Sequence, residues 1–297
     1  MYYSTNTLRQ IKIYDMNEKL INVKGITFSY GRKKANVFED FSMSLNRGAV
    51  YGLLGKNGTG KSTLLYLMCG LLRPKAGQVL MNGIDVKLRL PQTLRDTFLV
   101  PEEFSFPNLP LKQFVKLNAP FYPHFSDEIL RRCLADFDMD TDIHLNELSM
   151  GQKKKAFMCF ALATNTPLLI MDEPTNGFDI PSKSQMRKVI ASSMTDEKTI
   201  VISTHQVRDV ENLLDHVLMI DSNRLMLDAT FNAIAERLYF AELPLNEPTD
   251  DALFVQPSLQ GKSAIFRNRT GEESPINLEL LFNAMLAEGD KIKDALK

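Results

Sequence analysis

The sequence predicts an α/β fold in which a mostly parallel sheet carries helices on its faces. A short apolar segment, Ala49–Leu54, runs directly into a glycine-rich loop, and a segment with helical spacing follows. Strand and helix patterns then alternate from Gly151 to Ser203. Such alternation is typical of parallel sheets, because a crossover helix has to connect two parallel strands.

The elements begin after a polar N-terminal extension, which we assign to residues 1–19. Alternation of apolar and polar residues predicts strands, whereas apolar residues three and four apart predict helices. In chain order we expect strands at 20–29, 38–45, 49–54 and 78–81, with a helix at 63–72. Residues 104–147 contain several prolines and helical patterns such as Asp127–Phe137.

The second half continues with a helix after Gly151, a strand at 168–171, a helix at 182–194 and a strand at 199–203. Two short strands around Ser222-Asn223 predict a hairpin. From residue 231 the composition changes, since prolines interrupt short apolar runs before an amphipathic segment at 276–286. We therefore expect a small C-terminal α/β appendage at 231–297.

Composition excludes several classes of protein. The chain has 297 residues, a formal net charge of −1 and a hydrophobic fraction of 44%, as in ordinary globular proteins. No basic excess points to nucleic acid, so we expect none as a partner. Three cysteines without paired short spacing argue against disulfides and zinc, and favour a reducing cytoplasm.

We expect no membrane span in this sequence. The longest uncharged stretch, Ala156–Met171, is shorter than the ~20 apolar residues that a span requires, and Asn165-Thr166-Pro167 interrupts it. Met1–Leu20 lacks the apolar core of a secretory signal. A membrane role would therefore act through a partner.

The glycine-rich loop matches the phosphate-loop pattern in full. Its glycines let backbone N–H groups converge on one point, and the helix that follows adds its positive end. Lys61 is predicted to reach the β- and γ-phosphates, and the Ser62 hydroxyl to bind Mg²⁺. The predicted nucleotide-binding residues of this loop are Gly55, Lys56, Asn57, Gly58, Thr59, Gly60, Lys61, Ser62 and Thr63.

Two acidic residues, Asp172 and Glu173, end an apolar strand. At the carboxyl end of a parallel strand they would face the phosphate loop of a neighbouring strand. We expect Asp172 to hold Mg²⁺ through water, and Glu173 to polarise the attacking water as a general base.

The segment Leu148-Ser149-Met150-Gly151-Gln152 opens a predicted helix. Ser149 would serve well as a simple helix cap, and the same N-terminus could also present N–H groups to an anion. The residues alone leave both interpretations open. Lys153, Lys154 and Lys155 follow, and we interpret them as a solvated helix face.

The phosphate loop, the Leu148–Gln152 segment and the acidic strand end occur in the order that resembles the ATP-binding-cassette (ABC) ATPases. The resemblance covers residues 20–230 and implies a P-loop NTPase-type core with an antiparallel β subdomain and a helical subdomain at about 104–160. In that family ATP is sandwiched between two cassettes. A homodimer or a paired cassette is therefore expected.

The resemblance also implies roles for individual residues. Ser149, Gly151 and Gln152 would contact the γ-phosphate bound by the opposite subunit. Asp179 resembles the D-loop aspartate, which contacts the other cassette. His205, after the strand at 199–203, stands at the place of the switch histidine that hydrogen-bonds the γ-phosphate.

Three further residues, Tyr30, Glu102 and Met150, occupy positions that the family pattern marks. Tyr30 resembles the aromatic residue that stacks on adenine. Glu102 stands where the family has the Q-loop glutamine, and its carboxylate could bind Mg²⁺ or water while adding negative charge near the triphosphate. Met150 replaces the usual glycine of the Leu148–Gln152 segment.

A single cassette without long coiled coils resembles the stand-alone ATP-binding subunits of transporters. The resemblance is greatest to bacterial multidrug- or peptide-type exporters, and it implies ATP hydrolysis coupled to a separate membrane permease. The chain would then lie in the cytoplasm, peripheral to the inner face of the cell membrane. The alternative is a soluble regulatory ABC ATPase that acts as an ATP-dependent switch on a non-membrane partner.

Overall fold

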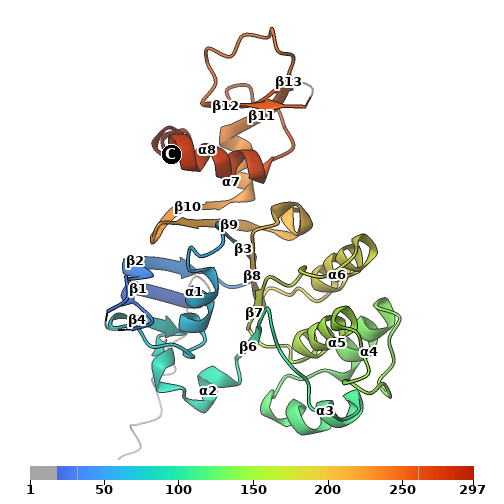
Figure 1. Cartoon of the computed structure of the whole chain (residues 1–297). Coiled ribbons are helices and arrows are strands. Elements are labelled where there is room, and N and C mark those ends of the chain that lie inside the picture. Colours follow the sequence, from blue (N-terminus) through green and yellow to red (C-terminus); the bar gives the residue numbers. More distant parts are fainter. Residues whose placement is uncertain (1–18, 32, 260) are drawn as a thin grey trace, which may run out of the picture.

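The computed structural model describes residues 19–31, 33–259 and 261–297. The predicted N-terminal extension, 1–19, lies outside the described residues apart from Lys19. Within these residues the chain forms three sheets and their flanking helices (Figure 1). The mixed α/β class predicted from the sequence is confirmed.

The central sheet has six strands in the order β10-β9-β3-β8-β7-β6. Its pairs β3–β8, β3–β9, β7–β8 and β6–β7 are parallel, and β10 pairs antiparallel with β9. The strands are β3 (Val50–Leu54), β6 (Thr97–Val100), β7 (Leu168–Asp172), β8 (Thr199–Thr204), β9 (His216–Asp221) and β10 (Arg224–Thr230). The carboxyl ends of β3, β7 and β8 therefore meet at one edge.

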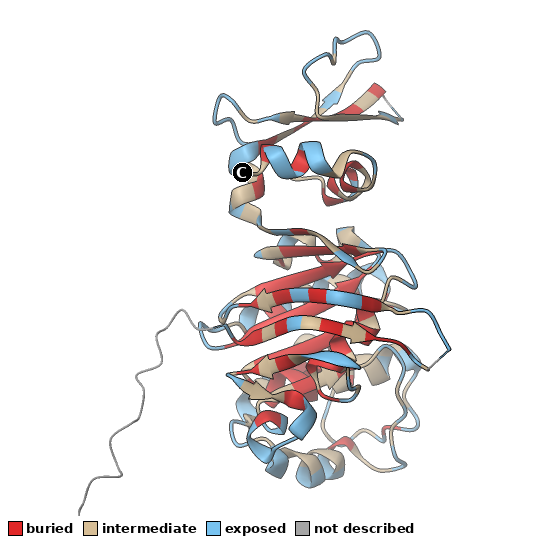
Figure 2. Ribbon diagram, turned by 90° about the vertical axis from the view of Figure 1, so that its left-hand side faces the viewer, coloured by how far each residue is buried: buried red, intermediate tan, exposed pale blue. Residues whose placement is uncertain are grey.

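A second, antiparallel sheet has the order β2-β1-β4-β5. It consists of β1 (Ile21–Phe28), β2 (Phe38–Leu45), β4 (Ala76–Met81) and β5 (Ile84–Asp85). Helix α1 (Lys61–Met68) shares one buried core with this sheet and with residues of the central strands such as Tyr51 and Ile170. Figure 2 shows how buried residues follow the strands of both sheets.

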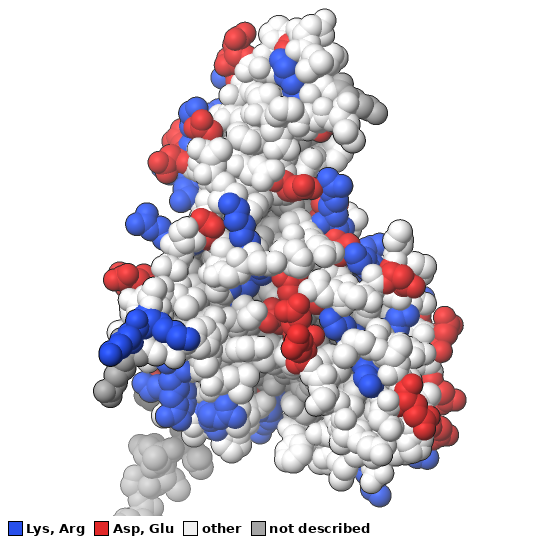
Figure 3. Space-filling view, viewed as in Figure 1, with Lys and Arg blue, Asp and Glu red and all other residues white. Residues whose placement is uncertain are grey.

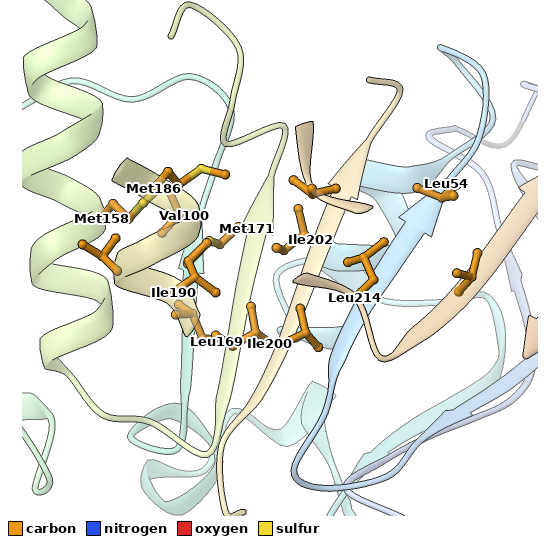
Figure 4. Close-up of a cluster of buried hydrophobic side chains, with 14 of the residues drawn as sticks. Leu54, Val100, Met158, Leu169, Met171, Met186, Ile190, Ile200, Ile202 and Leu214 are labelled. Carbon is orange, nitrogen blue, oxygen red and sulfur yellow. The ribbon is translucent and has the colours of Figure 1, made fainter. Parts of the chain in front are cut away.

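Helices α3 (Leu111–Asn118), α4 (Asp127–Asp136), α5 (Met150–Ala163) and α6 (Ile180–Ser192) cover the other side of the central sheet. Helix α2 (Pro91–Leu94) and the 3₁₀ turn Val86–Leu88 lie on the side of α1 in Figure 1, and Val86 belongs to the core of α1. Further 3₁₀ turns lie at Ala119–Phe121, Val207–Asp209 and Glu211–Leu213. Met158 on α5 and Ile190 on α6 pack towards Met171 and Ile202 of the sheet (Figure 4). This packing fixes the start of α5 relative to the strand ends.

The C-terminal part consists of α7 (Phe231–Arg237), β11 (Leu238–Leu243), β12 (Phe254–Ser258), β13 (Gly261–Arg267) and α8 (Leu278–Ala295). Its three strands form an antiparallel sheet in the order β11-β13-β12, beyond the β9–β10 hairpin in Figure 1. Helix α8 contacts β10 and the 3₁₀ turn Val207–Asp209. The domain boundaries proposed from the sequence stay predictions.

Two helices end at other residues than the sequence predicts. Helix α1 ends at Met68, because Gly70 adopts a positive φ of 66° that an L side chain rarely takes. Helix α8 continues to Ala295, well beyond the expected segment 276–286, with a kink at Glu288. None of the helices in the described residues is long and apolar enough to cross a bilayer.

Candidate nucleotide-binding site

The loop between β3 and α1 has a shape that depends on glycine. Gly60 has a φ of +101°, and a Cβ there would lie 2.8 Å from Val37 Cγ1. A Cβ on Gly55 would lie 2.7 Å from the Ile220 carbonyl oxygen. Larger residues would therefore push the loop away from the strands that hold it.

Lys61 is buried at the first turn of α1. Its Nζ donates hydrogen bonds to the carbonyl oxygens of Gly55, at 2.9 Å, and Lys56, at 3.3 Å. The same ammonium lies 3.6 Å from Glu173 Oε1. Its positive charge thus sits between the phosphate loop and the acidic end of β7.

Glu173 occupies a left-handed backbone conformation, with a φ of +45°. Its backbone N–H is held at 3.1 Å by the carbonyl oxygen and by Oγ of Ser203. One carboxylate oxygen lies 2.9 Å from His205 Nδ1, and the other accepts the His205 backbone N–H at 3.3 Å. The structure therefore brings together the predicted base and the predicted switch histidine.

Asp172 lies beside Glu173 at the end of β7 and is buried. Burial raises the pKa of its carboxyl group, hydrogen bonds from Ser203 and Ser62 lower it, and the nearby Glu173 and Glu102 raise it further. The net result is a pKa above the ordinary value.

A carboxylate and a hydroxyl are the hard oxygen ligands that Mg²⁺ prefers. Asp172 and Ser62 therefore suit the ion in chemistry and in placement. Among the described residues no group of three or more His, Cys, Asp or Glu side chains forms a metal site. The other oxygens would come from phosphate and water, as is usual for Mg²⁺ at nucleotide sites.

The phosphate loop, Glu173 and His205 border one cavity of about 400 Å³. Figure 3 shows acidic side chains gathered near the middle of one face of the molecule, between the lobe that contains α1 and the helices α5 and α6. The cavity is lined by Tyr30, Val37, Asn57, Gly58, Gly60, Lys61, Ser62, Thr63, Glu102, Glu173 and His205. Predicted site residues from five separate segments thus meet around it.

Tyr30 lies at the open side of this cavity and is 56% exposed. Its hydroxyl is 2.8 Å from Thr63 Oγ1, and its ring meets Phe28 edge-on. One face of the ring is therefore available to a planar ligand. Val37 lines the same cavity but was not predicted, because nothing in its local sequence marks it.

The predicted cross-subunit residues lie outside the cavity lining. Ser149 caps α5 in a reciprocal pair: its Oγ accepts the Gln152 N–H at 3.3 Å, and Gln152 Oε1 accepts the Ser149 N–H at 3.0 Å. Asp179 caps α6 through the Ser182 N–H, and hydrogen bonds to Ser182 hold its pKa below the usual value. Ser149 and Asp179 therefore do act as helix caps, and this role is compatible with a further role at the nucleotide.

The structure adds two residues, Ser203 and Asn176, that the sequence did not single out. Ser203 pairs with Asp172 in the β7–β8 register and donates to its Oδ1. Asn176 Nδ2 donates to Glu102 Oε1 at 2.8 Å, and its own carbonyl oxygen accepts from Lys154 Nζ at 2.7 Å.

The prediction of a solvated lysine face is wrong, because Lys153, Lys154 and Lys155 are all half-buried. Lys154 and Lys155 also donate hydrogen bonds, Lys155 to Gln185 Oε1 at 3.2 Å. Helix α5 packs against α4 and β6, and the hydrogen bonds of its lysines reach Asn176 and Gln185 on neighbouring segments.

Comparison with known proteins places this arrangement in a family. A family model described as ABC transporter matches residues 38–176. The bacitracin transport ATP-binding protein BcrA of Bacillus licheniformis is 30% identical over 224 residues, an alignment that covers 73% of this chain and 72% of BcrA. The chain belongs to the ABC transporter ATP-binding proteins.

Two further relatives differ in the direction that their names state. Nod factor export ATP-binding protein I of Mesorhizobium japonicum is 30% identical, over 69% of this chain and 61% of the relative. Methionine import ATP-binding protein MetN of Carboxydothermus hydrogenoformans is 29% identical, over 70% and 65%. The chain spans less than two thirds of the length of these two relatives.

Solved structures of ABC cassettes support the same assignment. A structure titled as the ATP binding subunit of an ABC transporter aligns with a TM-score of 0.65 and 26% identity, covering 72% of this chain and 91% of that one. CbiO1 of Clostridium perfringens aligns with a TM-score of 0.60 and shows the shared fold at 23% identity, over 71% and 88%. This chain is an ATP-binding subunit of an ABC transporter and an ATPase, with the P-loop NTPase-type fold expected from the sequence.

Proposed function

We propose that this ABC cassette hydrolyses ATP with Glu173 as general base, and that hydrolysis drives export through a separate membrane permease. The observation that carries the proposal is the contact between Glu173 and His205, at 2.9 Å, beside the phosphate loop. A carboxylate already held by a histidine and facing a phosphate cavity suits the activation of water.

Lys61 supplies the positive charge of the site. In the present arrangement its ammonium binds two carbonyl oxygens of its own loop. On ATP binding it would turn to the β- and γ-phosphates, since phosphate oxygens are stronger acceptors than carbonyl oxygens. Gly58, Gly60 and Asn57, which line the cavity, would offer backbone N–H groups to the same phosphates.

Mg²⁺ is proposed as the cofactor that accompanies ATP, and it would neutralise charge on the phosphate oxygens when bound. Ser62 and Asp172 are the residues that would hold it. Glu102 lines the cavity and is retained as a further candidate, because its carboxylate already stands at the wall.

A second cassette would complete the site. Ser149, Gly151, Gln152 and Asp179 do not line the cavity of their own chain. Exposed apolar side chains accompany them, since Met150 is 59% and Ile180 is 83% exposed. Apolar groups beside two helix N-termini suit a surface that meets another subunit, so we propose a homodimer or a paired cassette with ATP between the two.

A permease partner is supported by exposed apolar residues around α2 and α3, which lie at the same end of the molecule in Figure 1. The large exposed side chains of this region are Leu88, Leu90, Leu94, Leu117 and Phe121, the last 70% exposed. Apolar side chains of this number are costly in water and suit a partner. Through it the chain would lie at the cytoplasmic face of the membrane.

Export is proposed from the resemblance of the sequence to bacterial exporters, whereas the names of the relatives include both export and import. The direction can be measured in inverted membrane vesicles that contain the chain and its permease. An exporter would load such vesicles with cargo upon addition of ATP, and an importer would not.

The decisive experiment for hydrolysis is Glu173→Gln. The amide keeps the shape but cannot accept the proton of water, so hydrolysis should fall at least a hundredfold while ATP still binds. It also removes negative charge from the interface, so an ATP-dependent dimer should appear in size-exclusion chromatography. A variant that retains the parent rate would show that Glu173 is not the base.

The regulatory alternative is tested separately. The chain is purified from detergent-solubilised membranes, and companions are identified by mass spectrometry. Recovery of a chain with several hydrophobic spans, lost on Phe121→Asp, supports the permease. Recovery of only a non-membrane partner would favour a soluble ATP-dependent switch.

A further inference from the structure

Three residues from distant parts of the chain form a continuous chain of hydrogen bonds next to the phosphate cavity. Lys154 on α5 donates to the Asn176 carbonyl oxygen at 2.7 Å. The Asn176 side-chain amide donates to Glu102 Oε1 at 2.8 Å. Glu102 in turn lines the cavity. The wall of the cavity is thereby connected to the first turns of α5.

The position of Lys154 is unusual for a lysine with access to solvent. Its side chain is half-buried and turned towards the acidic residues of the site. Burial lowers the pKa of its ammonium, while the charges of Glu102, Glu173 and Glu103, in that order, raise it. A lysine gives up hydration and side-chain freedom to lie there, so its contacts have to offset that cost.

The acidic wall presents a problem for a triphosphate. Glu102 and Glu173 both line the cavity, and Lys61 is the lysine among the residues that line it. Glu173 is buried but Glu102 is exposed, so water weakens the repulsion between Glu102 and a triphosphate without removing it. A fixed position and a nearby positive charge would lower that repulsion further.

We propose that Lys154 is a positioning residue which, through Asn176, holds the Glu102 carboxylate and offsets its charge, so that ATP can enter beside an acidic wall. The inference rests on the proposed function, because it concerns the same cavity. It also gives α5, whose first residues carry the Ser149–Gln152 segment, a direct connection to the cavity wall.

The test is a double-mutant cycle on ATP hydrolysis. Lys154→Met removes the charge but keeps the apolar stem, and it is made in the parent and in the Glu102→Gln background. In the parent it should raise KM for ATP about tenfold, the usual scale for a lost charge-assisted hydrogen bond, with a smaller effect on kcat. In the Glu102→Gln background KM should change less than about twofold, because the Glu102 charge, which acts most strongly on Lys154, is gone.

Lys155→Met is the matched control. It removes the same charge from the neighbouring residue of α5, but Lys155 binds Gln185 and lies over the Phe137 ring. Its KM for ATP should equal that of the parent. An equal rise in KM for both lysine variants would show a general effect of charge and overturn the proposal.

Two more variants test the proposal if Lys154→Met does not fold. Asn176→Ala removes the amide that holds Glu102 and leaves the carbonyl oxygen that Lys154 binds, so it should raise KM only while Glu102 is present. Lys154→Arg keeps the charge and should retain most of the parent affinity. If Asn176→Ala raises KM equally in both backgrounds, the relay to Glu102 does not exist.

The outcomes separate this inference from the function on which it rests. A Glu173→Gln variant that hydrolyses ATP at the parent rate contradicts the proposed function. An inactive Glu173→Gln variant, combined with a Lys154→Met effect that is the same with Glu102 or with glutamine there, contradicts the positioning role alone.

Discussion

His205 contacts both oxygens of the Glu173 carboxylate, one through its imidazole and the other through its backbone N–H. His205 Nδ1 lies 2.9 Å from one carboxylate oxygen, and the His205 backbone N–H lies 3.3 Å from the other. The two residues follow neighbouring parallel strands, β8 and β7, so the sheet itself sets their separation. The proposed base is thus oriented before ATP arrives, which would reduce the reorganisation that hydrolysis requires.

We expect His205→Ala to lower kcat for ATP about a hundredfold, the lower end of the range for a group that takes part in proton transfer. The variant loses the side-chain contact with Glu173 and the group that would contact the γ-phosphate. Steady-state ATPase assays measure the effect. His124→Ala, which changes an exposed histidine, serves as the control and should keep the parent kcat.

Lys61→Ala should weaken ATP binding as well as turnover. The variant removes the ammonium expected on the β- and γ-phosphates, and it leaves Glu173 without the charge now 3.6 Å away. Calorimetry should show an affinity at least about tenfold lower, as expected for a lost charge-assisted contact. Lys188→Ala removes a lysine that pairs with Asp136 on the surface, and it should bind ATP normally. Unchanged affinity of Lys61→Ala would contradict the assignment of the loop.

The sequence was informative where chemistry and spacing are local. The loop 55–63 needs glycines next to one another in the chain, and the apolar strand before Asp172 carries its own signal. Their meeting at one edge followed from the parallel topology, which the alternation of strands and helices predicted. The cavity, with Lys61, Glu102, Glu173 and His205 around it, is therefore largely visible in the sequence.

Residues that depend on packing between distant segments were not visible. Ser203 gains its role from the register that places it beside Asp172, and a serine at a strand end has no special pattern. Lys154 lies within a run of three lysines, and only the packing of α5 shows that it is the one that reaches Asn176. The full length of α8 was missed as well, because Gly289 and the kink at Glu288 interrupt its amphipathic pattern.

A buried lysine away from the site, Lys198, makes stability depend on pH. It is 2% exposed, and burial lowers the pKa of its ammonium to about 8, with smaller effects of Cys133, which raises it, and Arg132, which lowers it. The unfolded chain keeps the ordinary value of 10.5. Between these values the unfolded state binds more protons, so this group makes the fold more stable as pH rises.

Lys198→Met should therefore stabilise the protein at pH 7, where the buried ammonium is charged, by as much as about 3 kcal/mol. The gain should shrink as pH rises from about 8 towards 10.5. Urea unfolding at pH 7 and pH 10 measures it. The exposed Lys188→Met is the control, and a gain that does not change with pH would point to packing instead of charge.

The C-terminal helix reaches the nucleotide site through one side chain. Phe282 on α8 shares a cavity of about 240 Å³ with Lys56, Asn57 and His205. Phe282→Ala should lower the free energy of unfolding by about 1–2 kcal/mol, since the ring is only half-buried. It should also lower kcat, because the segment that carries His205 loses the aromatic ring that lines the same cavity.

Chemical denaturation and ATPase assays on the same preparation measure both effects. Leu245→Ala, which changes a 73% exposed residue of the C-terminal part, should alter neither. A destabilised Phe282→Ala protein with the parent kcat would mean that α8 packs against the site without influencing it.

The shared site is tested most directly by mixing two inactive variants, Lys61→Ala and Ser149→Arg. In the mixed dimer one composite site carries both lesions, and the other combines an intact phosphate loop with an intact Ser149 segment. ATPase activity should therefore appear on mixing, although each variant alone has two damaged sites. If each chain instead hydrolysed ATP alone, Ser149→Arg would be nearly as active as the parent, because its own phosphate loop is untouched. An active Ser149→Arg protein with no gain on mixing would leave a monomeric P-loop ATPase.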